Sequence, residues 1–227
     1  MFKFLKSNDK RQFQKISYSQ SGEDLIVQYI FDAIGIEKPS YLDIGAYHPY
    51  RFSNTALFYE KGSRGVNVEP DPVLFKKFPD DRPEDVNLNI GVGLERGEAD
   101  FFIMSSPTLN TFSRQEAERY QRETQYKLKE VKKLKVDTYQ NLVETYFKNA
   151  PDFLSLDVEG WDEVLIKNID YSRSAPVVIC VETITFSEKG KGVKQKGIID
   201  FLQQAGYLYY ADTNINSIFV LKTKWER

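Results

Sequence analysis

Two short segments constrain the fold of this chain more than any other feature: Tyr41–Tyr50 and Gly65–Pro70. In the first, apolar residues lead into Asp43, as in a buried strand of a parallel sheet, and Gly45 follows where the chain must turn sharply and let a ligand approach. The second is an apolar strand that ends at Glu69. In doubly wound α/β folds, an acidic side chain at the end of the second strand binds ribose hydroxyls. The two segments therefore predict a nucleoside-binding α/β fold.

The turn after Asp43 lacks the glycine pattern of a dinucleotide site. Such a site has Gly-x-Gly-x-x-Gly directly after the strand, where backbone amides bind the pyrophosphate, and an acidic residue about 20 positions further on. Here Gly45 is followed by Ala46-Tyr-His-Pro49, and Glu69 lies 26 positions after Asp43. This pattern disfavours a nicotinamide-dependent oxidoreductase. A cofactor that has a ribose but no phosphate, S-adenosylmethionine, fits better.

Further motifs follow along the chain between residues 17 and 222. They are Ser19-Gln-Ser-Gly-Glu-Asp24, Leu42-Asp-Ile-Gly-Ala46, Ser53-Asn-Thr55, Val68-Glu-Pro70, Asn87-Leu-Asn-Ile-Gly-Val-Gly93, Asn110-Thr-Phe-Ser113, Val136-Asp137, Leu154-Ser-Leu-Asp-Val-Glu-Gly-Trp161 and Val181-Glu182. In this order and at these spacings, the chain resembles the FkbM-type S-adenosylmethionine-dependent methyltransferases. The resemblance implies methyl transfer from S-adenosylmethionine to a hydroxyl oxygen, on a sugar of a glycan or its precursor. The alternative is a non-catalytic scaffold protein that binds the cofactor without turnover.

Apolar runs alternate with helical patterns along the chain, as in a parallel sheet with helices on both faces. We predict strands near residues 40–45, 65–69, 86–91, 152–157, 176–182, 207–211 and 217–222, and helices near 20–34, 54–61, 71–78, 138–148, 161–168 and 194–205. The connection 213–216 is too short for a crossover helix, so the last strand must run antiparallel to its neighbour. We expect an α/β, Rossmann-like fold with a mostly parallel seven-stranded sheet. The resemblance implies its class I methyltransferase form.

Residues 98–136 interrupt this alternation. They contain the apolar run Ala99–Met104, a charged helical stretch from Ser113 to about Leu128, and a second run, Val131–Val136. The segment has too few apolar residues for a core of its own. We therefore predict an insertion over the active site, within a single methyltransferase domain that spans residues 17–227. Residues 1–16 are expected to form a flexible leader.

The expected cofactor site lies at the first three strands and at the helix that follows the turn. We assign Asp43 to the methionine amino group and Glu69 to the two ribose hydroxyls. The resemblance implies that Asn87 or Asn89 holds the adenine edge, although either could instead belong to a turn. It also implies that the helix start after Ser53 faces the methionine carboxylate, in addition to its capping role. The expected cofactor-binding residues are Asp43, Gly45, Ala46, Ser53, Asn54, Thr55, Glu69, Pro70, Asn89 and Asp157.

Carboxylates also end two later strands. Asp157 follows the buried run Phe153–Leu156, Glu159 comes two residues later, and Glu182 ends the next strand. Buried carboxylates need compensation, which the sulfonium charge, a divalent cation or His48 could supply. We expect Asp157, Glu159 and Glu182 to bind Mg²⁺ or Mn²⁺, since oxygen ligands suit these ions. The alternative is that a carboxylate acts as the general base.

His48 is the only histidine in the chain. A lone histidine is usually structural, but this one lies in the predicted site loop and titrates near neutrality, as a base should. The predicted catalytic residues are therefore Asp157, Glu182 and His48, with His48 also considered as a metal ligand.

Composition limits the partners and the compartment. Lysine and arginine number 31 against 33 aspartate and glutamate residues, so no nucleic-acid partner is expected. The basic run Lys127–Lys135 is interrupted by Glu130, which favours a solvated strand or helix edge over a phosphate-binding patch. No segment approaches the roughly 20 apolar residues of a membrane span, so we expect no stable membrane insertion. Cys180 lies alone in an apolar run, which excludes a disulfide within the chain and indicates a reducing, cytoplasmic setting. The sequence leaves open which small molecule or glycan is the acceptor, and the oligomeric state.

Overall fold

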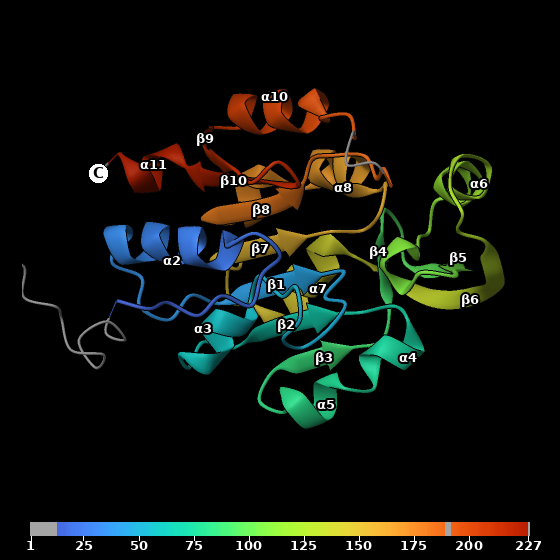
Figure 1. Cartoon of the computed structure of the whole chain (residues 1–227). Helices are drawn as coiled ribbons and strands as arrows, with labels where there is room; N and C mark the ends of the chain where they lie inside the picture. Colours follow the sequence, from blue (N-terminus) through green and yellow to red (C-terminus); the bar gives the residue numbers. More distant parts are fainter. Residues whose placement is uncertain (1–12, 189–191, 227) are drawn as a thin grey trace, which may run out of the picture.

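The structure is a computed structural model that describes residues 13–188 and 192–226 (Figure 1). The strands of the main sheet are β1 (Tyr41–Ile44), β2 (Gly65–Val68), β3 (Val86–Leu88), β7 (Phe153–Leu156), β8 (Val178–Glu182), β9 (Tyr207–Asp212) and β10 (Asn216–Leu221). Their order is β3-β2-β1-β7-β8-β10-β9. β1 pairs in parallel with β2 and β7, whereas β10 is antiparallel to both of its neighbours. The mostly parallel seven-stranded sheet with an antiparallel last strand confirms the predicted fold class.

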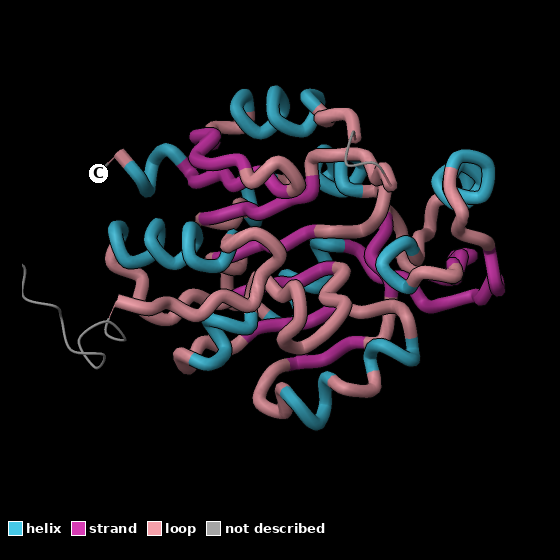
Figure 2. Tube along the Cα trace, viewed as in Figure 1, coloured by secondary structure: helices cyan, strands magenta, loops and turns pink. Residues whose placement is uncertain are grey.

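Helices cover both faces of this sheet, as its doubly buried strands require. Leu42 and Ile44 of β1 belong to a core cluster with side chains of α7 (Tyr139–Tyr146), α8 (Asp162–Asn168) and α10 (Lys196–Gln204). Tyr41 belongs instead to a cluster with α2 (Glu23–Ile34) and α3 (Ala56–Glu60). Because side chains alternate along a strand, Asp43 lies on the same face as Tyr41. Figure 2 shows the cyan helices on the outside of the magenta strands.

The remaining helices of the main body are short: α4 (Pro72–Phe75), α5 (Phe78–Asp81), α9 (Tyr171–Ser174) and α11 (Lys222–Trp225). The single helix predicted at 71–78 is therefore two helices, and neither α9 nor α11 was predicted. The helix predicted at 20–34 begins at Glu23, because Gly22 takes a left-handed conformation with φ 90°. Within the described part of the chain, no helix has both the length and the apolar character needed to cross a membrane.

Residues 91–138 contain a second, smaller sheet beside the carboxyl ends of the main strands (Figure 1). Its elements are β4 (Gly91–Gly93), β5 (Gly97–Met104), the short helix η1 (Pro107–Leu109), α6 (Arg114–Glu123) and β6 (Leu128–Thr138). β6 pairs with β5 in antiparallel and with β4 in parallel. The strand predicted at 86–91 was therefore too long: β3 ends at Leu88, and β4 joins the other sheet. The chain changes sheets at Asn89, whose side-chain amide binds the carbonyls of Glu69 and Pro70.

The segment before α2 is held by one buried carboxylate. Asp24 accepts hydrogen bonds from the hydroxyls of Ser17 and Ser19 and from the backbone amide of Tyr18. Of the expected leader, residues 1–12 lie outside the described residues, and residues 13–16 are described, with exposed side chains.

Candidate active site

A cavity of about 530 Å³ lies at the carboxyl ends of β1, β2, β7 and β8. Residues of η1 and of the loop before α6, the loop after β8 and the β9–β10 loop complete its walls. Ligands of open α/β sheets bind at this edge of the sheet. Of the predicted site residues, the cavity is lined by Asp43, Gly45, Ala46, Asn54, Glu69, Pro70, Asp157, Glu159 and Glu182.

Gly45 closes the cavity floor by allowing β1 and β7 to end side by side. Its φ is +79°, and a Cβ atom there would lie 1.7 Å from the carbonyl oxygen of Asp157. No other residue fits this position, because both the left-handed backbone and the close approach exclude a side chain. The amides of Gly45 and Ala46 donate to the carbonyl of Val68, which joins the turn to the end of β2.

Glu69 presents a buried carboxylate to the cavity. One oxygen accepts the amide of Tyr47 at 2.8 Å and the other accepts the amide of Asp71 at 2.7 Å. A carboxylate oxygen has two lone-pair sites, so each can accept one further hydrogen bond. Burial, together with the charges of Asp71 and Asp43, raises the pKa of Glu69 to about 8. The two amides thus fix the orientation of the side chain, and each oxygen can still accept a hydrogen bond from a ligand hydroxyl.

Three residues at the start of α3 were predicted to lie near the methionine carboxylate, and only one of them lines the cavity. Asn54 lines the cavity, and its side-chain amide donates to the hydroxyl of Ser155 at 3.3 Å. The other two side chains do not line the cavity and serve the fold. Ser53 caps the helix by accepting the amide of Ala56, and Thr55 binds Asp43. Ser53 and Thr55, which were predicted to contact the cofactor, therefore lie behind the cavity lining.

Asn87, Asn89 and His48, which were also predicted to belong to the site, lie outside the cavity lining. Asn89 is exposed and does not line the cavity, because its amide group is used on the loop after β2. Asn87 instead binds the carbonyl of Arg82 at 2.9 Å, which leaves it outside the cavity as well. His48 also lies outside the cavity lining. Its Nδ1 accepts the amides of Tyr50 and Arg51, both at 3.1 Å, so the ring braces its own loop. Burial and the nearby charge of Lys77 lower the pKa of His48.

Three carboxylates meet within the cavity: Asp157, Glu159 and Glu182, here called the acidic corner. One oxygen of each lies within 4.8 Å of those of the other two. Asp157 and Glu182 come together because they end β7 and β8, which pair in parallel. Glu159 is brought in by a tight loop in which it has φ 49° and Gly160 has φ 96°. A Cβ atom on Gly160 would lie 2.5 Å from a side-chain carbon of Glu116, so α6 packs directly on this loop.

The acidic corner has no cationic partner among the described residues: no lysine or arginine forms an ion pair with it. Burial raises the pKa of each of the three carboxyls. The charge of Asp43 adds to this rise in pKa at Asp157, and the charge of Asp157 adds to it at Glu159 and Glu182. Glu159 has partial support, since the hydroxyl of Tyr120 donates to its carboxylate at 3.0 Å and Thr111 donates to its carbonyl at 2.7 Å. The corner can therefore hold protons near neutrality or bind a cation.

Several residues at the site were not assigned a role from the sequence. Gln20 and Asn216 line the cavity, and Tyr120 and Thr111 support Glu159. The motif around Gln20 was a usable signal, because it belongs to the resemblance. Asn216 gave none: it lies opposite Glu182 in the register of β8 and β10 and donates to Glu23, a contact across 193 positions of sequence.

A known protein family matches most of this chain. The sequence matches the methyltransferase FkbM domain over residues 43–209, a range that begins at Asp43 and includes Glu69 and the whole acidic corner. No curated protein matches the chain. Among solved structures, the chain is similar to a TehB-like SAM-dependent methyltransferase from Corynebacterium glutamicum, with 14% identity, a TM-score of 0.43, and coverage of 95% of this chain and 93% of that one. The domain match spans most of the chain. This protein therefore belongs to the FkbM family of S-adenosylmethionine-dependent methyltransferases.

Proposed function

We propose that this methyltransferase acts on a hydroxyl oxygen of a sugar, in a glycan or its precursor. The observation that carries the proposal is the acidic corner, three carboxylates with raised pKa values inside the cofactor cavity. Transfer to an alcohol requires removal of the hydroxyl proton, and groups that take up protons near neutrality suit that task. A scaffold protein that only binds the cofactor has no need of uncompensated acids at this position.

The residues of the other half of the cavity fit S-adenosylmethionine. Glu69 has two free acceptor sites for the ribose hydroxyls, and Asp43 is a carboxylate that suits the amino group of the methionine portion. Asn54 lines the cavity and carries an amide that suits the methionine carboxylate, and Ala46 and Pro70 also line the cavity. When bound, the cofactor supplies an electrophilic methyl group on a sulfonium. The protein binds and orients it through these five residues.

Either of two roles for the acidic corner would activate the acceptor. In the first, Asp157 or Glu182 accepts the proton of the sugar hydroxyl directly. In the second, Asp157, Glu159 and Glu182 hold Mg²⁺ or Mn²⁺, which lowers the pKa of a bound alcohol. The three oxygen ligands and their mutual proximity fit such an ion. We favour the metal, because the corner lacks any other cation among the described residues.

A pair of aromatic residues at the cavity supports a sugar as acceptor. Tyr47 and Phe52 both line the cavity and both have left-handed backbones, with φ 55° and 60°. Their rings stack with centroids 6.3 Å apart and an interplanar angle of 18°, and Phe52 is 42% exposed. Strained residues of this kind persist at ligand sites. An aromatic face packs on the C–H groups of a sugar while nearby carboxylates bind its hydroxyls.

We place the reaction in the cytoplasm, in keeping with the buried free thiol of Cys180.

The test is a screen of sugars and glycan intermediates for transfer of a labelled methyl group, with and without a chelator. We expect transfer to a hydroxyl, loss of transfer in chelator, and recovery with Mg²⁺ or Mn²⁺. Asp157→Asn should abolish turnover while S-adenosylhomocysteine still binds. The matched control is Asp32→Asn, on the exposed face of α2.

Each result has a separate meaning. Full activity in excess chelator would reject the metal and leave a carboxylate as the base. Full activity of Asp157→Asn would reject the acidic corner as the reactive site. Methyl transfer to nitrogen or carbon acceptors only would reject the sugar hydroxyl as the substrate.

A further inference from the structure

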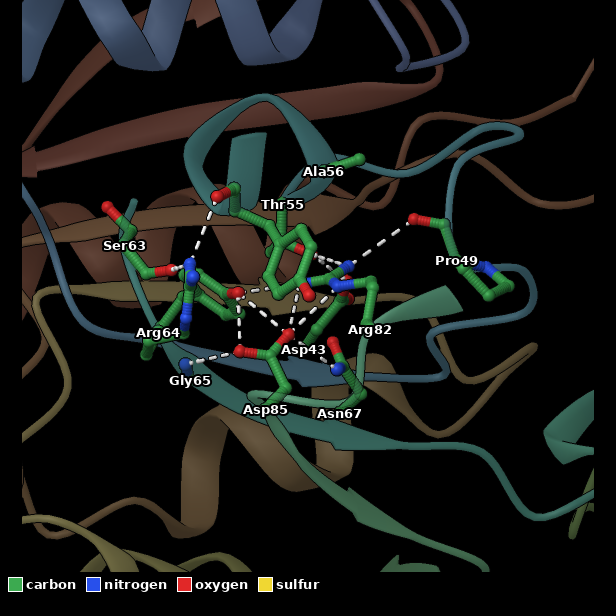
Figure 3. Close-up of polar contacts among 12 residues, drawn as sticks. Asp43, Pro49, Thr55, Ala56, Ser63, Arg64, Gly65, Asn67, Arg82 and Asp85 are labelled. Atoms are coloured by element: carbon green, nitrogen blue, oxygen red, sulfur yellow. Dashed lines mark hydrogen bonds and ion pairs between the residues drawn. The ribbon is translucent and has the colours of Figure 1, made fainter. Parts of the chain in front are cut away.

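One arginine is buried directly behind the cofactor turn. Arg82 follows α5 and is completely shielded from solvent, although it is the largest of the fully buried side chains. Its Nε and Nη2 bind Asp85 at 2.8 and 2.7 Å, and Nη2 also binds the hydroxyl of Tyr41 at 2.7 Å. Nη1 donates to the hydroxyl of Thr55 at 3.0 Å and reaches the carbonyl of Pro49 at 3.4 Å. Figure 3 shows these contacts converging on the guanidinium group.

Asp85 is fully satisfied within this group. Besides Arg82, it accepts hydrogen bonds from the hydroxyl of Tyr41, the amide of Gly65 and the side chain of Asn67 (Figure 3). A buried ion pair needs additional hydrogen bonds of this kind to offset its desolvation. The charges of Arg82 and Asp85 are therefore compensated without Thr55. The hydrogen bond from Nη1 to Thr55 joins this pair to a different part of the structure.

That contact leads to the cofactor turn. The hydroxyl of Thr55 accepts from Arg82 and lies 2.7 Å from a carboxylate oxygen of Asp43. A threonine hydroxyl has one hydrogen, and an ionised carboxylate can only accept. The direction of the chain is thus fixed: Arg82 donates to Thr55, and Thr55 donates to Asp43. Asp43 itself lines the cavity.

We infer that Arg82 and Thr55 are positioning residues that hold the Asp43 carboxylate, ionised and in one orientation, for the amino group of the cofactor. The inference rests on the proposed assignment of Asp43 to that amino group. Burial, aided by the charge of Asp85, raises the pKa of Asp43, and the hydrogen bond from Thr55 and the charge of Arg82 offset part of that rise. Without the relay, the carboxyl would take up a proton at higher pH and bind an ammonium group poorly.

The test compares Thr55→Val with Thr55→Ser in the full-length protein, using calorimetry with two ligands. S-adenosylhomocysteine contains the amino-acid portion, and 5′-methylthioadenosine lacks it. Thr55→Val removes the hydroxyl at similar volume and keeps the Arg82–Asp85 pair, whereas Thr55→Ser keeps the hydroxyl. We expect Thr55→Val to lower the affinity for S-adenosylhomocysteine about tenfold, as for a lost charge-assisted contact. The affinity for 5′-methylthioadenosine should not change. Thr55→Ser should bind both ligands as the wild-type protein does.

The pH dependence separates positioning from a structural role. In Thr55→Val the loss of S-adenosylhomocysteine affinity should be larger at about pH 6 than at about pH 8, because Asp43 ionises as the pH rises. Equal weakening of both ligands, no weakening of either, or a loss that does not change with pH would overturn the inference.

A second variant keeps the inference testable if Thr55→Val does not fold. Asp43→Asn should lower the affinity for S-adenosylhomocysteine at every pH and leave the affinity for 5′-methylthioadenosine unchanged. An equal loss of affinity for both ligands in this variant would overturn the inference. A wild-type protein that bound neither ligand would reject the cofactor site itself, and the inference with it. That failure is distinct, because it would appear before any substitution.

Discussion

The two halves of the crevice contain carboxylates that are buried in the first and half-buried in the second, and their charge is compensated in opposite ways. At β1 and β2, Asp85 and Asp43 share the charge of Arg82, directly or through Thr55. At β7 and β8, the acidic corner receives one hydroxyl, from Tyr120, and no described cation. Within the first half, the group formed by Arg82, Asp85, Thr55 and Asp43 is complete within the protein, whereas Glu69 keeps free acceptor sites for a ligand. The second half is completed only by something that binds there, a proton, a metal ion or an acceptor, which is the property expected of the reacting side.

Loss of the internal cation should give the largest effect on folding. Arg82→Met leaves Asp85 buried without its counterion, and breaking a buried pair in this way costs about 3–5 kcal/mol. Urea denaturation should show that decrease in the free energy of unfolding. Arg96→Met is the control, because the Arg96–Asp137 pair is largely exposed on the arginine side and should contribute less than about 1 kcal/mol. A decrease for Arg82→Met no larger than that of the control would contradict the comparison.

The second largest effect should come from removing Glu69, the proposed acceptor of the ribose hydroxyls. Glu69→Ala should weaken the binding of S-adenosylmethionine by about 1–3 kcal/mol, the cost of leaving the ribose hydroxyls without a partner in a buried site. Calorimetry measures the effect, and Glu98→Ala, at an exposed position of β5, is the control. Unchanged affinity in a folded Glu69→Ala variant would remove Glu69 from the cofactor site.

The pH dependence of stability follows from the raised pKa of Glu69. The folded state keeps a proton on this carboxyl up to about pH 8, whereas the unfolded state releases it near the ordinary value of 4.5. Between these values the folded state binds more protons, so stability falls as the pH rises. We therefore expect Tm to fall as the pH rises across this range. Glu69→Gln should flatten the slope. Equal slopes in both proteins would show that Glu69 has an ordinary pKa.

The smallest effect should come from relieving the acidic corner. Glu182→Gln removes one of three carboxyls that repel one another, so it should raise the free energy of unfolding slightly. Mg²⁺ or Mn²⁺ should raise the Tm of the wild-type protein and have less effect on this variant. Glu95→Gln, at an exposed position, is the control. A destabilised Glu182→Gln variant would mean that Glu182 has a favourable partner in the apoprotein.

The sequence was most informative where function follows from the ends of parallel strands. Asp43, Glu69, Asp157 and Glu182 each end an apolar run, and such ends converge on one edge of a sheet, so all four line the cavity. Prediction was poorest in loops. His48 and Asn89 had suitable chemistry and position along the chain, but short-range hydrogen bonds direct His48 into its own loop and Asn89 toward the loop after β2.

The sequence by itself determined the family, the sheet with its antiparallel last strand, and the strand-end carboxylates, because these depend on local patterns and on strand order. Only the tertiary structure decided how each carboxylate is compensated. Arg82 looked like an ordinary charged residue near the end of a helix, and Tyr120 lay in a charged stretch of the insertion, yet folding buries the first behind Asp43 and brings the second to Glu159. Compensation depends on contacts between segments far apart in the chain, and the burial that gives those contacts their strength exists only after the chain has folded.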